Sequence, residues 1–149
     1  MRIVATIEAR MTSSRLPGKV LMTAGGVPML EHLVTRLKAV ASIQTIVLAT
    51  TVNKADDPLI EFSKQENINY YRGSEDDVML RVIEAAESVN ADIIVEITGD
   101  CPIIDPKIVE KTIQMFLAHS ADYVSNAHIR SYPDGMDTQV FKLETLKRS

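Results

Sequence analysis

The residues most able to do chemistry lie in one short segment near the start of the chain. Between Ala9 and Lys19 the sequence reads ARMTSSRLPGK, with three cations and three hydroxyl side chains. Arginine can bind phosphate oxygens through two parallel hydrogen bonds, and lysine adds a compact charge. Serine hydroxyls and free backbone N–H groups can complete a cradle for a polyphosphate. The segment predicts a phosphate-binding loop, and a solvated basic loop is the alternative.

Two known phosphate-binding motifs do not fit this loop. A Walker A motif needs a glycine five residues before Gly18, where this sequence has Ser13. It also needs Ser or Thr after Lys19, where Val20 stands. No G-x-G-x-x-G pattern follows any predicted strand, so a dinucleotide fingerprint is absent as well. Phosphate binding here would depend on the Arg, Lys and Ser side chains of another kind of loop.

A second candidate is Asp100, in the segment ITGDCP that ends a short β-branched run. A lone carboxylate can bind Mg²⁺, because this ion takes few protein oxygens and keeps waters and phosphate oxygens. A turn aspartate that caps the following loop is the alternative. Cys101 and the three histidines have no spacing typical of a metal site or a catalytic triad, and we interpret them as structural.

The order of the predicted elements places both candidates at one edge of a sheet. Short apolar runs predict strands at Arg2–Ala9, Ile43–Thr51 and Ile93–Thr98, with a weaker strand at Asn69–Tyr71. Between them lie helical patterns, the first formed by an apolar stripe from Met29 to Val40. Aspartates in capping positions predict further helix starts at Asp57-Pro58, at Asp76 or Asp77, and at Asp105-Pro106. The tail from Lys142 to Ser149 is typical of the beginning of a helix.

Alternating strands and helices indicate an α/β fold: a Rossmann-like three-layer sandwich with a mostly parallel sheet. Ligands of such sheets bind beyond the carboxyl ends of the strands. Both the basic loop and Asp100 directly follow predicted strands, so both are expected at that edge. From the third helix, Val78 and Val82 are expected to face inward.

Composition narrows the class of protein. The 149 residues fit one domain, residues 1–149, with 46% hydrophobic residues and a formal net charge of −4. The acidic balance argues against general nucleic-acid binding, and no apolar run has the length of a membrane span. A single cysteine fits a reducing compartment, and the N-terminus does not read as a signal peptide, so we expect a cytoplasmic protein.

Four segments together resemble one family. The loop has the form R-x-x-S-x-R-L-P-G-K, the segment Gly26–Leu30 has the form G-x-P-hydrophobic, and Thr98–Pro102 has the form T-x-D-x-P. The segment Tyr132–Phe141 is similar to P-x-G-x-D-x-E-V-F. The chain resembles the spore-coat polysaccharide biosynthesis protein F family, which is acylneuraminate-cytidylyltransferase-like and similar to 3-deoxy-manno-octulosonate cytidylyltransferases. The resemblance implies the nucleotide-diphospho-sugar transferase fold.

The resemblance also implies an activity and a set of site residues. The activity is transfer of CMP from CTP to a sugar, with release of pyrophosphate, in surface polysaccharide or glycoconjugate synthesis, and Mg²⁺ is the implied cofactor. The implied nucleotide-binding residues are Ala9, Arg10, Ser14, Arg15, Lys19 and Thr98. The implied catalytic residues are Arg15, Lys19 and Asp100, with Asp100 also on the metal, and the implied acceptor-sugar residues are Asp137 and Gln139.

The sequence departs from the family pattern at two positions. Gln139 stands where the family carries Glu, and Glu96 stands where relatives often carry Arg. The loss of charge at Gln139 puts the orientation or specificity of the sugar in doubt, whereas Glu96 is a local change of charge. For Asp137, a turn residue after Pro133 and Gly135 is the alternative to an acceptor or metal role.

The resemblance covers the whole chain, but full-length relatives continue into a C-terminal segment with a second metal-binding Asp and part of a dimer contact. A homodimer is compatible with the resemblance. One expectation is a chain that binds CTP and turns over slowly or not at all, a nucleotide-binding module. A glycosyltransferase ranks last, because the D-x-D motif of its usual metal site does not occur.

Overall fold

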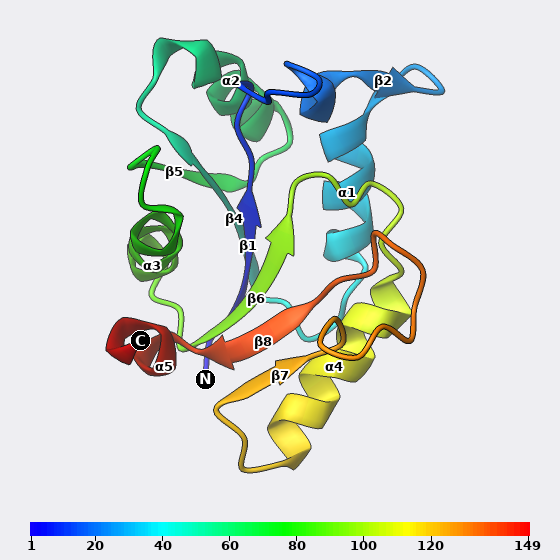
Figure 1. Ribbon diagram of the computed structural model, residues 1–149, viewed down its shortest axis with the longest axis vertical. Helices are drawn as coiled ribbons and strands as arrows, with labels where there is room; N and C mark the ends of the chain where they lie inside the picture. The colour runs from blue at the N-terminus through cyan, green and yellow to red at the C-terminus, as the bar shows by residue number, and fades with distance from the viewer.

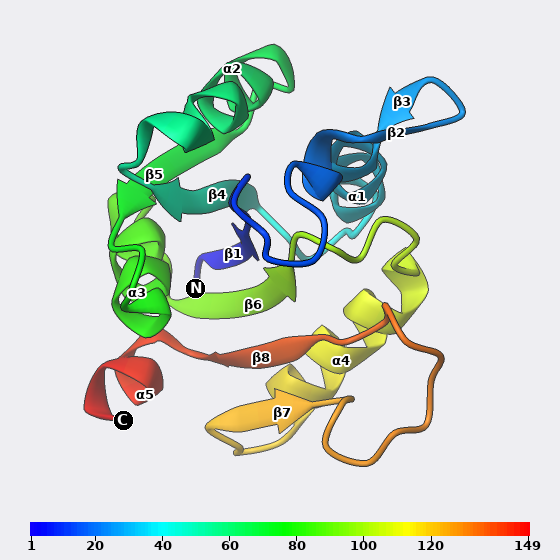
Figure 2. The ribbon, with the colours of Figure 1, turned by 45° about the horizontal axis from the view of Figure 1, so that its top comes forward.

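The computed structural model describes residues 1–149 and is built on a six-stranded sheet with the strand order β5-β4-β1-β6-β8-β7. A separate two-stranded hairpin, β2-β3, projects beside the first helix (Figures 1 and 2). The strands are β1 (Ile3–Glu8), β2 (Thr23–Ala24), β3 (Val27–Pro28), β4 (Thr45–Thr51), β5 (Asn69–Gly73), β6 (Ile93–Thr98), β7 (Tyr123–Ser125) and β8 (Gln139–Lys142).

The first four strands of this order are parallel, as the alternating pattern predicts. β1 pairs in parallel with both β4 and β6, so it occupies the middle of the sheet. In Figure 1 the arrowheads of β1 and β6 point the same way, toward the loop that follows β1. The predicted strands at 2–9, 43–51, 69–71 and 93–98 are confirmed, with ends shifted by up to two residues. The sequence interpretation missed β7 and β8, which add an antiparallel edge.

Five α-helices cover the two faces of the sheet (Figure 1). α3 packs on β4, β5 and β1, and α5 packs beside α3 and β8 on the same face. The opposite face is covered by α1, α2 and α4. The helices are α1 (Met29–Lys38), α2 (Asp57–Gln65), α3 (Val78–Ser88), α4 (Pro106–Ala118) and α5 (Leu143–Arg148). Two short 3-10 helices lie before the first two of them: η1 (Lys19–Leu21) before α1, and η2 (Lys54–Asp56) directly before α2.

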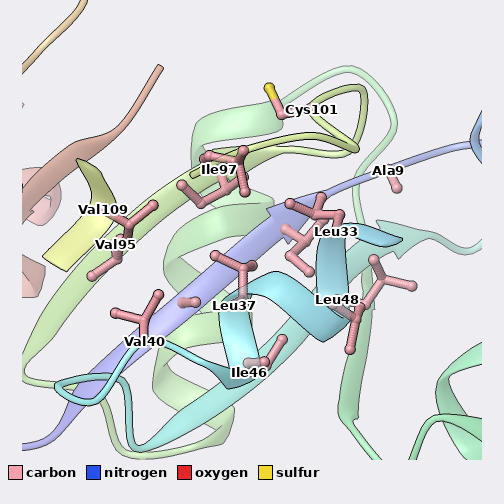
Figure 3. Close-up of a cluster of buried hydrophobic side chains, with 14 of the residues drawn as sticks. Ala9, Leu33, Leu37, Val40, Ile46, Leu48, Val95, Ile97, Cys101 and Val109 are labelled. Atoms are coloured by element: carbon pink, nitrogen blue, oxygen red, sulfur yellow. The ribbon is translucent and has the colours of Figure 1, made fainter. Parts of the chain in front are cut away.

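Strand alternation divides the apolar side chains between two cores. Residues of β1 at odd positions, such as Ile3 and Ile7, point into a large core under α1, α2 and α4. Figure 3 shows Leu33 and Leu37 of α1 packed over Leu48 of β4 and Ile97 of β6 in this core. Residues at even positions, such as Val4, point into a smaller core under α3 and α5. At the carboxyl edge the same alternation turns Thr6 and Glu8 toward the α3 face.

The helix starts follow the predicted caps with one exception. Asp77 accepts a hydrogen bond from the N–H of Leu80 at 2.9 Å, and Asp105 caps α4 at the N–H of Lys107 at 2.8 Å. The predicted cap at Asp57 is wrong, because Asp57 already lies inside α2. Asp56 precedes the helix, but its side chain makes no capping bond and is used elsewhere.

One predicted inward-facing residue is also wrong. Val78 is 41% exposed because it lies at the open end of α3. The predicted helix at the tail is confirmed as α5. None of the helices combines the length and apolar composition that crossing a bilayer requires.

Candidate nucleotide-binding site

A polar cleft of about 340 Å³ opens at the carboxyl ends of β1 and β6. Its walls come from the loop after β1, the turn after β6 and the first turn of α3. This is the edge at which open parallel sheets bind ligands. The lining residues are Glu8, Ala9, Arg10, Thr12, Ser13, Ser14, Lys19, Val20, Val78, Arg81, Thr98, Gly99 and Asp100.

The cleft brings together most of the residues that the sequence singled out for nucleotide binding. Five of the six predicted nucleotide-binding residues line it, together with Asp100; the five are Ala9, Arg10, Ser14, Lys19 and Thr98. Arg15 is the exception, since it is exposed and is absent from the lining. Arg10 lies 3.6 Å from the carboxylate of Glu75, a weak and half-exposed ion pair that a phosphate could replace.

Asp100 sits between a hydroxyl and a cation. Thr98 donates a hydrogen bond from Oγ1 to one carboxylate oxygen at 2.7 Å, and Lys19 Nζ lies 3.5 Å from the other. The hydrogen bond from Thr98, with the charge of Lys19 as a smaller cause, lowers the pKa of Asp100. Asp100 is therefore ionised at neutral pH, and its side chain, 54% exposed, is open to a ligand. Lys19 is placed to bridge this carboxylate and an incoming phosphate.

The turn after β6 has no room for a side chain at Gly99. A Cβ there would lie 2.8 Å from the backbone oxygen of Glu8 and 3.0 Å from Ala9 Cβ. The N–H of Gly99 donates to that same Glu8 oxygen at 2.8 Å. This contact ties the turn that carries Asp100 to the start of the basic loop, so the two parts of the cleft are held at a fixed distance.

The basic loop has a second anchor, the buried carboxylate of Asp56. One oxygen accepts a hydrogen bond from the backbone N–H of Met11 at 2.7 Å, and the other accepts from the hydroxyl of Thr51. Asp56 and Thr51 are fully buried, so water cannot replace these bonds. Asp56, which directly precedes α2, thus positions the loop immediately after Arg10. Sequence reasoning missed this role because the two segments lie 45 residues apart.

Asp56→Asn is expected to loosen this loop. The amide supplies only one acceptor oxygen, so a buried donor loses its partner at a cost of about 1–2 kcal/mol in the free energy of unfolding. CTP affinity should fall several-fold, although Asp56 does not line the cleft. Urea unfolding and titration calorimetry measure the two effects. Asp57→Asn is the matched control, since Asp57 makes only a surface pair with Arg72 at 2.8 Å. Equal behaviour of the two variants would contradict the anchoring role.

Arg81 is a cleft residue that sequence reasoning did not select. It stands one helical turn into α3, only 3% exposed, and donates from Nη1 to the backbone oxygen of Ser74 at 2.7 Å. Its Nε has no hydrogen-bond partner. Burial lowers its pKa, and the nearby charge of Glu8 opposes this. A D-V-x-x-R pattern at the helix start could have drawn attention to it, but the aspartate's capping role explained that pattern.

The two predicted acceptor-sugar residues lie apart from this cleft. Gln139, at the start of β8, faces Glu96 directly across the β6–β8 pair. The two positions at which the sequence departs from the family pattern are therefore cross-strand partners. Tyr123 donates from its hydroxyl to the side-chain oxygen of Gln139 at 3.0 Å. Asp137 is exposed, and its charge contributes to raising the pKa of buried Cys101, for which burial is the larger cause.

The donor set fits a magnesium ion only if a nucleotide shares it. No group of three or more His, Cys, Asp or Glu side chains converges on a common point. Asp100 offers an ionised, accessible carboxylate beside the basic loop, and the other carboxylate next to this loop, Glu75, pairs with Arg10. Mg²⁺ is often bound by one or two carboxylates together with phosphate oxygens and waters. The residues present fit that mode and not a metal cage made of protein ligands alone.

A mostly parallel sheet covered by helices on both faces, with a basic, hydroxyl-rich loop opposite an ionised aspartate at its carboxyl edge, has the α/β architecture of the nucleotidyltransferase fold. The chain belongs to the cytidylyltransferase family, whose model matches residues 4–148.

Known relatives agree with this assignment. The spore coat polysaccharide biosynthesis protein SpsF of Bacillus subtilis is 34% identical over 97% of this chain and 60% of its own length. A solved cytidylyltransferase from Leptospira borgpetersenii is 36% identical, with a TM-score of 0.94 over 99% of this chain and 63% of that one. CMP:2-keto-3-deoxy-manno-octonic acid synthetase, solved with CTP, shares the fold at 21% identity and a TM-score of 0.74, over 99% of this chain and 77% of that one. The chain spans about 60% of the length of the curated relatives it matches first.

Proposed function

We propose that this protein binds CTP in the cleft at the carboxyl ends of β1 and β6 and transfers CMP to a sugar, with release of pyrophosphate. The observation that carries the proposal is the convergence of Arg10, Ser14, Lys19 and Asp100 on one cleft. Family membership supports a cytidylyl transfer, and the likeness to SpsF supports a product used in surface polysaccharide synthesis. As part of the proposal we place the protein in the cytoplasm, which suits its free cysteine.

In the proposed complex the loop after β1 holds the triphosphate. Lys19 and Arg10 neutralise phosphate charge, and the hydroxyl of Ser14 with neighbouring backbone N–H groups completes the cradle. Arg81 supplies a buried donor, Nε, that a nucleotide oxygen or ring nitrogen would satisfy. Arg15 would reach the ligand only if the exposed end of the loop folds over it, as loops over active sites commonly do.

An oxygen of the sugar would attack the α-phosphorus of CTP. A new P–O bond forms as the bond to the β-phosphate breaks, and pyrophosphate leaves in line with the attacking oxygen. Asp100 would hold Mg²⁺, which neutralises charge on the phosphates when it is bound. The protein's own contribution is to align the two reactants and to keep cations beside the departing pyrophosphate.

Titration calorimetry with CTP and Mg²⁺ tests the binding half of this proposal. Lys19→Ala should weaken CTP binding by ~1–3 kcal/mol, the range for a hydrogen bond to a charged group. Arg15→Ala should weaken it by a similar amount if the loop closes and by almost nothing if Arg15 remains outside. Lys111→Ala on the exposed face of α4 removes the same charge as Lys19→Ala and should leave affinity unchanged. Unchanged affinity in Lys19→Ala would refute the assigned site.

A further inference from the structure

One residue of the nucleotide cleft has a buried donor that the folded chain leaves without a partner. Arg81 lines the cleft from the first turn of α3 and is only 3% exposed. Its Nη1 donates to the backbone oxygen of Ser74 at 2.7 Å, whereas its Nε is buried and has no hydrogen-bond partner. Buried polar groups are nearly always paired, because an unmade hydrogen bond costs stability. The free edge of the guanidinium is therefore available to a ligand in the cleft.

The end of β5 holds the Arg81 side chain in place. A Cβ at Gly73 would lie 3.0 Å from Arg81 Cγ and 3.3 Å from Arg81 Cβ, so a larger residue there would press on the stem of the arginine. The next residue, Ser74, supplies the oxygen to which Nη1 donates. Contacts at the stem and at the tip thus fix the direction of the guanidinium. Its free edge presents two parallel donors, Nε–H and one N–H of Nη2, which suit a ligand with two adjacent acceptors.

The charges around Arg81 disfavour a phosphate as its ligand. The carboxylates of Glu8, Asp56 and Glu75 lie close enough to interact with its charge, and Arg10 is a nearby cation. Asp56 anchors the basic loop and Glu75 pairs with Arg10, so neither carboxylate occupies the free edge of the guanidinium. A phosphate placed at this edge would meet three negative charges, whereas a neutral group would not.

An apolar surface lies beside this edge. Val78 stands three residues before Arg81 in α3, which places the two side chains on one face of the helix. Val78 is 41% exposed and lines the same cleft, as does Ala9 directly after β1. The hydroxyls and the lysine that suit a phosphate come from the loop between Thr12 and Lys19. A flat, neutral ring with two adjacent acceptors therefore fits the Arg81 end of the cleft.

We propose that Arg81 recognises the base of the bound nucleotide and selects cytosine over uracil. In cytosine N3 and O2 are adjacent acceptors, so the two parallel donors of Arg81 can bind both at once. In uracil N3 carries a hydrogen, which would face a donor and leave it unpaired. Guanine has a comparable pair of acceptors, O6 and N7, on a larger ring, and membership of the cytidylyltransferase family favours cytosine. This inference rests on the proposed function, because it assigns the group that recognises the base of CTP.

Three triphosphates with the same ribose and phosphates test the inference on the unchanged chain. They are CTP, UTP and 3-deaza-CTP, in which C–H replaces N3. Titration calorimetry with Mg²⁺ should show CTP binding at least about tenfold more tightly than either analogue, as a bidentate contact to a base edge discriminates. GTP, titrated in the same way, should also bind more weakly than CTP.

Arg81→Lys keeps the positive charge and removes the pair of parallel donors. CTP and UTP should then bind almost equally, while tripolyphosphate, which has no base, should bind this variant as it binds the unchanged chain. Arg36→Lys is the matched control, since Arg36 also donates to a backbone oxygen, that of Ile104 at 3.3 Å, and lies outside the cleft lining. It should retain the full preference for CTP. Lys19→Ala should instead weaken CTP and tripolyphosphate alike.

Each outcome separates this inference from the proposed function. CTP binding no more tightly than UTP, 3-deaza-CTP or GTP would overturn the inference. So would an undiminished preference for CTP in Arg81→Lys, or a loss of tripolyphosphate binding in that variant as large as its loss of CTP binding. If Arg81→Lys does not fold, the comparison of CTP with its analogues on the unchanged chain decides alone. If CTP binds without preference, only the role of Arg81 is wrong, and if no nucleotide binds, the proposed function fails as well.

Discussion

Asp100→Asn is expected to remove most of the Mg²⁺-dependent affinity for CTP and to slow CMP transfer by about 100-fold, the cost of misplacing reacting groups by ~1 Å. The substitution keeps size and shape but removes the charge. Thr98 can still donate its hydrogen bond to the amide oxygen, so the turn after β6 should stay folded. Lys19 loses its carboxylate partner and would pair with phosphate alone.

The measurement has a binding arm and a turnover arm. Calorimetry at constant ionic strength compares CTP affinity with and without Mg²⁺, and a pyrophosphate-release assay follows transfer to a panel of sugars. Asp122→Asn removes the same charge from an exposed connection between α4 and β7 and should behave as the unchanged protein. A Mg²⁺ effect of full size in Asp100→Asn would show that another group holds the ion.

Local sequence patterns predict the parallel half of this fold well. β1, β4 and β6 are nearly continuous apolar runs because both of their faces are buried. Such runs can be recognised in the sequence without knowing which strands pair with one another. The loop and Asp100 follow directly from those strands. Their convergence on one cleft needs only the rule that parallel strands end at the same edge.

Features set by distant neighbours could not be predicted in this way. β7 has three residues and β8 has four, too short for a clear pattern, and their pairing depends on register with β6. Asp56 has no recognisable role in the sequence, because the fold alone brings the N–H of Met11 to its carboxylate. Arg15 carries the charge that a phosphate site needs, yet its direction depends on how the loop turns at Gly18, where φ is +74°.

The placement of Glu8 and Glu96 on neighbouring strands belongs to the same class of feature. Glu8 ends one strand and Glu96 lies inside another, 88 positions later, and neither is unusual alone. Only the pairing of β1 with β6 places both on the α3 face. Burial then makes a second negative charge costly, and the proton is retained. The raised pKa of Glu96 therefore depends on the pairing of two strands, and no single segment of the sequence predicts it.

Glu96→Gln is expected to stabilise the protein at high pH and to remove a decline in stability that the unchanged protein shows as pH rises. In the unfolded chain Glu96 has an ordinary pKa near 4.5, and burial beside Glu8 raises it to about 8 in the folded state. Between these values the folded state binds more protons than the unfolded state. The free energy of unfolding therefore falls as pH increases from about 4.5 to 8.

Glutamine has nearly the same size and shape as glutamate and cannot ionise. At pH 9 the variant should be more stable than the unchanged protein by on the order of 1–3 kcal/mol, and near pH 4 the two should agree. Urea unfolding at pH 4, 6, 7.5 and 9 measures the difference, with Glu144→Gln as the exposed control. A difference that stays constant across this range would mean that Glu96 is already ionised in the folded protein and that burial does not raise its pKa.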